Sequence, residues 1–569
     1  MRRIRVPYLS ASGGWLFFLL CVALVSPRAA GSPSVALAFG FDGQFVRYHY
    51  APASVTVTGL DRPTAARLLI KQILDTRSTP PRVAVHEIFR GTVSNATYSA
   101  TVPAYDAVLP VLVQLVHEDG TVLASTTQPA RQSARGLPLV VIAGAPLHFD
   151  GSEAVVSPTS LPSDAWAYDG VASVWLTSPL TSRAAWMALG AWVSAGGSLV
   201  IFSGEDFYQW DCAAARHLLP LDDPVVLSSV DQPSFLSGIP RPGARVLLSA
   251  RGQPLLVRTP YGAGQVSLVT LRVRDLAAAE LARLNVHVPR ARPLLAAQSL
   301  AETLLNETRV LRPPYGFVPA ILGALLAGVV LAGRFARKHA RLAGLAAVLG
   351  VFLLSVACSF YVNLATTVAY QYSTETTLRI TTSFGFSTVS YCFFALTSSV
   401  VYVNHEKGAF PVQAGVPTSV DRVYAMESAL DATTLALPGG TRPVLRAHGR
   451  APAGLSLEVA DSESVTTYCV RRLLGQTLSA CLLVVDGFYY RVPRDALDVP
   501  VRLVDLTQVS ASALDGRETL LYRLVADWIG EMPDAWLVAL SEEESIASDL
   551  PGRAKVRLAD VDLVTGGRS

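Results

Sequence analysis

The pattern of apolar and polar positions changes along the chain, and it first indicates β-structure. From residue 35 to 133 the apolar residues come in short runs broken by turn-forming residues, which is typical of strands. The clearest hairpin joins Val111–Val116 to Thr121–Ser125 through Glu118-Asp119-Gly120, because Asp-Gly supplies the positive φ angles of a tight turn. We therefore predict a β-sandwich of immunoglobulin-like size over residues 32–136.

A different pattern begins at about residue 137. Leu139–Ala143, Val171–Leu176 and Ser198–Phe202 are near-continuous apolar runs, as expected of strands that are buried on both faces. Between the last two runs, apolar residues recur at helical spacing in the range 181–194. A helical crossover makes the strands that it joins parallel, so we predict an α/β domain over residues 137–310. An antiparallel pair, 255–259 and 266–271, is expected to extend its sheet.

Two apolar runs, Tyr315–Gly333 and Leu342–Tyr361, flank a short basic stretch from Arg334 to Arg341. Each approaches the roughly 20 apolar residues that a membrane-spanning helix needs. The sequence therefore predicts a transmembrane hairpin over residues 315–361 with its basic turn in the cytoplasm. Residues 1–31 have the layout of a secretory signal, either cleaved after Ala30 or Gly31 or kept as an anchor. The expected location is the bacterial inner membrane, multi-pass, with the lipid bilayer as one partner and most of the chain extracytoplasmic.

After residue 363 the pattern returns to short strands, which predicts a β-rich extracytoplasmic domain over 364–569. Ser383–Val403 is a candidate third span, but its polar residues favour paired β-strands. Asp486-Gly487 indicates a hairpin, and Glu518–Ile529 an amphipathic helix. Glu542–Glu544 is expected in a solvated loop.

Composition excludes some function classes. The net charge of +3 and the dispersed basic residues do not make a nucleic-acid footprint. Among the six cysteines, Cys469 and Cys481 form the one close pair, which is either a disulfide or two buried thiols. No His and Cys spacing indicates a zinc site, and we expect no metal, no cofactor and no cofactor-binding residue.

Three stretches, Tyr168–Val171, Leu189–Val200 and Tyr261–Val266, together resemble the class I glutamine amidotransferase-like domain of bacterial envelope proteins. The resemblance covers under a third of the chain. It implies an α/β domain and, in active members of the family, a cysteine nucleophile in a tight strand-to-helix turn.

The nucleophilic cysteine is absent here. After the strand that ends at Phe202, the chain continues Ser203-Gly204-Glu205-Asp206, and Cys212 comes several residues beyond the turn. Ser203 could serve instead with His148 or His217 as base, but nothing in the sequence places either imidazole beside it. We therefore predict a turn serine and no catalytic residue.

The function predicted from sequence is that of a non-catalytic envelope protein that binds or positions a protein partner, in one form as an accessory to a transport or assembly complex. The alternatives are an extracytoplasmic hydrolase that uses Ser203 and a supporting subunit of a transporter. Sequence leaves open the partner, signal cleavage, the oligomeric state and the pairing of the two cysteines.

Overall fold

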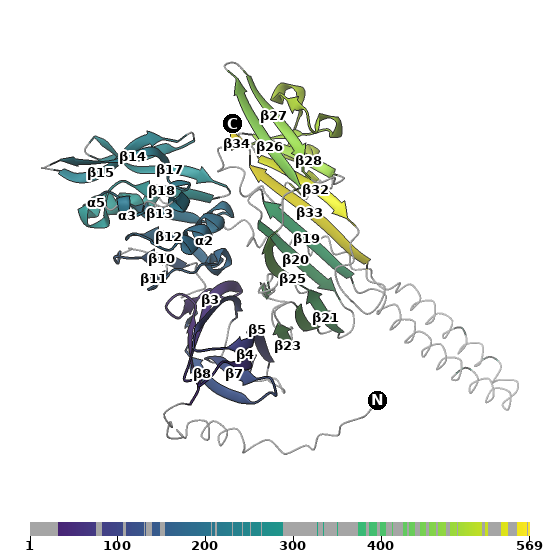
Figure 1. Ribbon diagram of the computed structural model, residues 1–569. Coiled ribbons are helices and arrows are strands. Elements are labelled where there is room, and N and C mark those ends of the chain that lie inside the picture. The colour runs from purple at the N-terminus through teal and green to yellow at the C-terminus, as the bar shows by residue number, and fades with distance from the viewer. Residues whose placement is uncertain are drawn as a thin grey trace.

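The computed structural model of the chain is dominated by β-strands (Figure 1). It describes residues 32–287 apart from short gaps (76–81, 106–109, 130, 133–138, 148–153, 206, 211–212, 230–231, 242, 251 and 263), the single positions 327, 334 and 350, and, within 374–568, the strands and short turns named below.

The first described part is a β-sandwich. One sheet has the order β1-β3-β6 (Ser34–Phe39, His49–Thr58, Thr97–Ala104). The facing sheet contains β4 (Thr64–Asp75), β5 (Arg82–Val93), β7 (Val111–His117) and β8 (Val122–Gln128). Apolar side chains that alternate along the strands fill the space between them, including Val55, Leu68 and Leu115, which are fully buried. The predicted hairpin is confirmed, because β7 and β8 pair antiparallel. Two further short strands, β2 (Gln44–Phe45) and β9 (Arg131–Gln132), pair with each other in parallel and form a separate sheet.

The second sheet of the sandwich also contains strands from far along the chain. Its full order is β21-β24-β23-β5-β4-β7-β8, with β21 at Ser399–Asn404, β23 at Ala425–Ser428 and β24 at Ala432–Leu437. β23 joins β5 in parallel, with Glu427 opposite Val85. Figure 1 shows the green β21 and β23 beside the purple β4 and β5. Strand pairing therefore crosses the boundary that was predicted between the N-terminal and C-terminal domains.

The α/β part contains a seven-stranded sheet of order β11-β10-β12-β13-β18-β17-β16. Its strands are β10 (Leu139–Ala143), β11 (Ala154–Val156), β12 (Val171–Leu176), β13 (Ser198–Phe202), β16 (Arg245–Ala250), β17 (Gln253–Tyr261) and β18 (Gly264–Val269). The first five strands of that order are parallel. Helix α2 (Arg183–Ser194) connects β12 to β13, so the βαβ prediction is confirmed, as is the antiparallel β17–β18 pair. Shorter elements are η2 (Ala165–Tyr168), α3 (Phe207–Trp210), α4 (Ala213–Arg216), the antiparallel arm β14–β15 (Leu221–Ser229, Gln232–Pro240), η3 (Val273–Asp275) and α5 (Ala278–His287).

Helix α2 begins at a side-chain cap and ends where the chain passes close to the sheet. The Ser182 hydroxyl accepts a hydrogen bond from the Ala185 N–H at 3.2 Å. Its buried face is Trp186, Leu189, Trp192 and Val193, as the helical spacing predicts. A Cβ on Gly264 would lie 2.2 Å from the carbonyl oxygens of both Val193 and Gly197. Only glycine therefore allows the β17–β18 turn to reach the end of the helix.

A buried carboxylate joins the α/β part to the sandwich. Asp169, which follows η2, accepts a hydrogen bond from the Tyr50 N–H at 3.1 Å, and its Oδ2 lies 3.1 Å from the Nδ1 of His49. A Cβ on the adjacent Gly170 would lie 2.9 Å from the Cβ of Val46. The two parts therefore meet at close range at the end of the sandwich where β3 begins.

The C-terminal region forms a nine-stranded sheet of order β22-β25-β20-β19-β33-β32-β28-β29-β31 and a four-stranded sheet of order β30-β27-β26-β34. The larger sheet contains β19 (Thr374–Thr382), β20 (Phe386–Phe394), β22 (Val412–Gln413), β25 (Val444–Arg450), β28 (Leu478–Val485), β29 (Phe488–Arg491), β31 (Thr507–Val509), β32 (Trp536–Glu543) and β33 (Lys555–Thr565). The smaller contains β26 (Leu455–Ser462), β27 (Val465–Arg472), β30 (Pro500–Val501) and β34 (Gly567–Arg568), and 3-10 turns occupy η5 (Arg494–Ala496), η6 (Leu503–Asp505) and η7 (Ala511–Ala513).

The structure tests several of the predictions about the C-terminal region. Ser383–Val403 contains strands β20 and β21, as preferred over a third span, although the two join different sheets. The hairpin at Asp486-Gly487 is confirmed by the pairing of β28 with β29. Glu542 and Glu543 are the last residues of β32, so the prediction of a solvated loop is wrong for these two. Most of the helix predicted over 518–529 lies outside the described residues.

The membrane predictions require correction. Within the part of the chain that the structure describes, no helix has both the length and the apolarity to cross a bilayer. The two-helix transmembrane hairpin, the transmembrane assignment and the multi-pass inner-membrane location are therefore withdrawn. Apart from Ala327, Arg334 and Gly350, the range 315–361 lies outside the described residues, as does the signal-like segment 1–31. The physical reason for the error is that hydropathy measures the preference of a segment for apolar surroundings, which a protein interior satisfies as well as lipid does.

Candidate functional site

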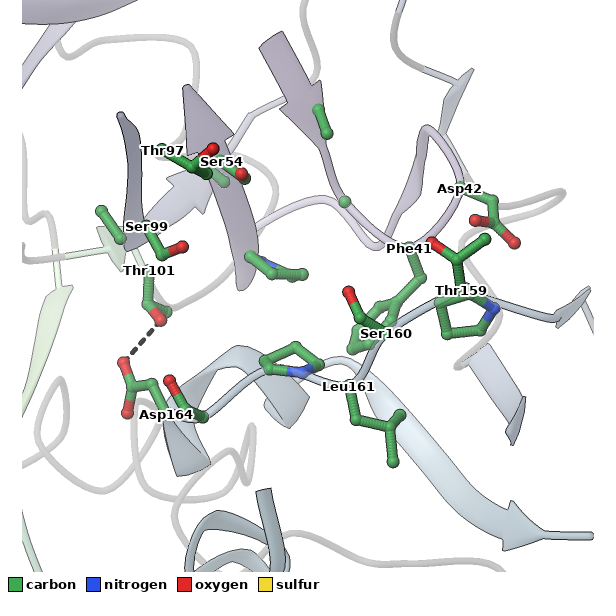
Figure 2. Close-up of a pocket in the computed structure, with 18 of the residues that line it drawn as sticks. Phe41, Asp42, Ser54, Thr97, Ser99, Thr101, Thr159, Ser160, Leu161 and Asp164 are labelled. Atoms are coloured by element: carbon green, nitrogen blue, oxygen red, sulfur yellow. Dashed lines mark hydrogen bonds between the residues drawn. The ribbon is translucent and has the colours of Figure 1, made fainter. Parts of the chain in front are cut away.

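A cleft with a volume of about 490 Å³ lies between the sandwich and the α/β part. One wall is the outer face of the β1-β3-β6 sheet, and the other is the segment 158–164 that leads into η2. Figure 2 shows hydroxyl groups from both walls around the cleft, with Ser54, Ser99 and Thr101 on one side and Thr159 and Ser160 on the other.

The hydroxyl row on the sheet follows from strand alternation. Along β3, apolar residues such as Val55 point into the sandwich core, and the residues between them point outward. The antiparallel register places Ser54 opposite Ser99 and Thr56 opposite Thr97. The Thr56 and Thr97 hydroxyls lie 3.0 Å apart, within hydrogen-bond distance. The outer face of this sheet therefore carries a row of small polar groups that runs into the cleft.

The opposite wall is held in place by three hydrogen bonds. The Thr101 hydroxyl donates to the Asp164 carboxylate at 2.5 Å (Figure 2), and the same carboxylate caps η2 by accepting from the Trp166 N–H at 3.2 Å. The Tyr168 hydroxyl donates to the Pro162 carbonyl at 2.9 Å. Burial, together with the nearby Asp164 charge, raises the pKa of Tyr168 above its ordinary value, so this hydroxyl stays protonated and remains a donor.

One residue that lines the cleft, Gln128, has a side-chain oxygen that is buried behind the cleft surface. The Oε1 of Gln128, at the end of β8, is inaccessible to solvent and has no hydrogen bond among the described residues. Leaving such an oxygen unpaired costs free energy. The carboxylates of Asp42 and Asp164 also line the cleft, and no lysine, arginine or histidine belongs to its lining. The site is therefore rich in acceptors and carries negative charge.

Ser203, the candidate nucleophile from sequence analysis, does not line the cleft. Ser203 follows β13 at the carboxyl end of the parallel strands and is 1% exposed. Its N–H donates to the Val269 carbonyl at 3.0 Å, whereas its hydroxyl has no hydrogen bond among the described residues. A serine nucleophile needs a base within hydrogen-bond reach, so the described structure supplies Ser203 with no activating group.

The polar residues next to Ser203 bind one another. Glu205 accepts a hydrogen bond from the Ser234 hydroxyl at 2.8 Å and forms an ion pair with Arg272 at 2.5 Å. Arg272 in turn contacts Asp275 at 2.7 Å. This chain of contacts ties the turn after β13 to the segment after β18, which is a structural role.

The other candidates from sequence have separate outcomes. His217 is exposed, and its backbone carbonyl accepts a hydrogen bond from Arg241 at 3.0 Å. His148, Asp206 and Cys212 lie outside the described residues. Cys469 and Cys481 are both buried free thiols, which decides between the two alternatives left open for them. Within the described ranges, no three His, Cys, Asp or Glu side chains form a group that could hold a metal ion.

Sequence analysis did not find the cleft. Its residues come from β1, the turn 40–43 that follows it, β3, β6, β8 and the segment 158–164, and no local motif connects them. The one available signal was the alternation of serine and threonine with apolar residues in Ser54–Thr58 and Thr97–Thr101. That alternation predicts a solvent-facing sheet surface but not the segment that covers it.

Comparisons with known proteins give little further information. No family model matches the chain, and no curated protein matches it. A cytoplasmic protein of Salmonella typhimurium is 13% identical over 27% of this chain and 100% of its own, with a TM-score of 0.21. An exo-β-1,4-mannosidase of Opitutaceae bacterium strain TAV5 is 20% identical over 27% of this chain and 33% of its own, with a TM-score of 0.17. TM-scores this low carry no argument about fold or function.

Proposed function

We propose that the protein is a non-catalytic binding protein that holds a partner in the cleft between the sandwich and the α/β part. The observation that carries the proposal is the cleft of about 490 Å³, which serine and threonine residues from both the sandwich and the α/β part line. Small-molecule and side-chain binding sites are concave and have a few convergent polar groups. An accessory role in an assembly complex, which the sequence suggested, is one form of this function.

The α/β part is proposed as the scaffold for one wall of the cleft. Its parallel strands and the turn after β13 support the proposed relation to amidotransferase-like domains, with Ser203 in the place where active members have cysteine. The unpaired Ser203 hydroxyl and the binding of Glu205 to Arg272 support a non-catalytic domain.

The binding role is tested by photo-crosslinking in cells that produce the protein. A photoreactive amino acid replaces Ser160, an exposed residue of the cleft, and in a matched variant it replaces Ser125, an exposed residue of β8 that does not line the cleft. We expect an adduct from position 160 and none from position 125. The adduct should disappear when Ser99→Trp fills the cleft. Equal labelling from both positions, or none from either, contradicts the proposed function.

The competing function is a hydrolase that uses Ser203, and the observation that favours it is the position of Ser203 directly after the parallel strand β13. A fluorophosphonate probe separates the two functions because it reacts with activated serines. We expect no labelling of the wild-type protein. Labelling that Ser203→Ala abolishes while the melting temperature stays unchanged would establish the hydrolase.

A further inference from the structure

We infer that the partner adds an extended segment of its own chain to the edge of strand β6, an inference that rests on the binding role proposed above. Among the described residues, β6 is the end strand of the sheet β1-β3-β6 and pairs only with β3. Thr97 and Ser99, in its first half, are exposed and also line the cleft. The first half of β6 is therefore accessible to another molecule at the place where the cleft lies.

The ladder between β3 and β6 shows which backbone groups of β6 point outward. The Val57 N–H donates to the Ala96 carbonyl at 2.9 Å. The next pair, Thr56 opposite Thr97, is therefore a non-hydrogen-bonded pair, because the two kinds of pair alternate along an antiparallel ladder. The N–H and C=O groups of Thr97, and of every second residue after it, point away from β3 and towards the outer edge.

The far end of this edge already has a partner within the chain. The side chain of Gln72 on β4 donates to the Pro103 carbonyl at 2.6 Å and accepts from the Tyr105 N–H at 3.0 Å. Pro103 has the outward phase that the ladder predicts, so these contacts agree with the direction assigned to the edge groups. The chain itself therefore satisfies the outer edge of β6 from position 103 onward.

The near end of the edge has no such partner. In the described structure, the outward N–H and C=O groups of Thr97, Ser99 and Thr101 make no hydrogen bond. These groups form a row of donors and acceptors at the spacing of a β-strand, which another extended backbone matches at the same spacing. Peptides bind sheet edges in this way by adding a strand. The row therefore indicates an extended chain segment as the occupant.

This part of β6 also lacks the residues that commonly protect an open edge. The five residues from Thr97 to Thr101 include no charged residue and no proline. Strand β14, at an edge of the β14–β15 arm, carries Asp222, Asp223 and Pro224. Charged residues and prolines on an edge oppose pairing with another chain. Their absence from β6 is the composition expected of an edge that receives a partner strand.

The charge of the cleft limits the side chains of the added segment. Alternate side chains of a strand point to the same face, so every second side chain of the segment lies on the face of the sheet that forms one cleft wall. Asp42 and Asp164 line the cleft, and its lining includes no lysine, arginine or histidine. An acidic side chain there would meet like charge. We therefore expect neutral or basic residues at these alternate positions of the partner segment.

The test uses twelve-residue peptides from a random library displayed on phage as probes. The library is depleted on the variant Ser160→Trp, which fills the cleft from an exposed position of the opposite wall, and is then selected on the full wild-type chain. Calorimetric titration measures binding of peptides that are N-methylated at one residue at a time. We expect N-methylation at every second residue to weaken binding at least tenfold and N-methylation at the residues between to leave it unchanged. Only alternate N–H groups of an added strand face β6.

Two substitutions of Ser99 test the edge from the protein side. Ser99→Pro removes an outward N–H and no hydrogen bond to β3, as an edge strand tolerates, and should weaken binding of the selected peptides at least tenfold. Ser99→Ala keeps this N–H and should bind as the wild type does. Equal losses in the two variants would place the contact on the serine side chain and contradict strand addition. If Ser99→Pro does not fold, the N-methylation series on the wild-type chain decides.

The inference is overturned if no cleft-dependent peptide is recovered or if N-methylation shows no period of two. It is also overturned if light scattering finds a dimer that Ser99→Pro converts to a monomer, because a second copy of this chain would then occupy the edge. Crosslinking from position 160 without periodic peptide binding would reject strand addition and leave the binding role intact, whereas absence of both rejects the two together.

Discussion

At the scale of single residues, Asp169 joins two parts of the chain with one carboxylate. It is 6% exposed and accepts a hydrogen bond from the Tyr50 N–H of β3 at 3.1 Å. We predict that Asp169→Ala lowers the free energy of unfolding by about 1–3 kcal/mol, because it removes a buried hydrogen bond to a charged group. Urea unfolding measures the change. Asp495→Ala, at an exposed position, serves as control and should stay within about 0.5 kcal/mol of the wild type.

His86 makes stability depend on pH. It lies fully buried on β5, and its ring stacks on that of Tyr105 at 6.0 Å. Burial lowers the pKa of His86 from 6.5 to about 3. At pH values between these two, His86 is protonated in the unfolded chain and neutral in the folded chain. The folded state therefore loses about 1.4 kcal/mol for each pH unit as the pH falls through this window.

The variant His86→Phe isolates this contribution. We predict that the free energy of unfolding of the wild type falls more steeply than that of the variant from pH 6.5 toward pH 4, because phenylalanine cannot be protonated. Urea titrations at several pH values measure both slopes. Parallel slopes would show that His86 does not titrate on unfolding.

At the scale of elements, β23 determines whether the sandwich sheet is complete. It pairs with β5 on one side and β24 on the other, with Glu427 opposite Val85 and Thr434. We predict that Glu427→Pro lowers the free energy of unfolding by about 3 kcal/mol or more, because proline removes a backbone donor from a central strand. Glu427→Ala keeps the N–H and is the control for loss of the side chain. Equal effects of the two variants on urea unfolding would place the cost in the side chain.

The elements also show which parts of the fold a sequence pattern can predict. β10, β12 and β13 have the bounds of the apolar runs that predicted them, because burial on both faces leaves a continuous local signal. The join between β5 and β23 has no such signal. Any strand with a free edge can accept a partner, and the pattern of a strand does not say which one.

At the scale of the whole molecule, residues after 399 are part of the N-terminal sandwich. We predict that a chain ending at residue 310 aggregates or unfolds more readily than the full chain, because it lacks β21, β23 and β24 and leaves the edge of β5 unpaired. Size-exclusion chromatography and thermal melting check this. Addition of the separate segment 399–437 should restore the monomeric state if edge pairing is the cause. A monomeric, equally stable truncated chain would contradict the prediction.

The sequence by itself determined the short strands of the sandwich, the βαβ unit around α2 and the absence of a cysteine after β13. These are local properties, since alternation, helical spacing and a single residue can all be found in a short window. Only the tertiary structure decided the addition of β23 to β5, the free state of Cys469 and Cys481, and the cleft beneath segment 158–164. Each of these depends on which surfaces meet in space, and that is set by the packing of segments distant in the chain.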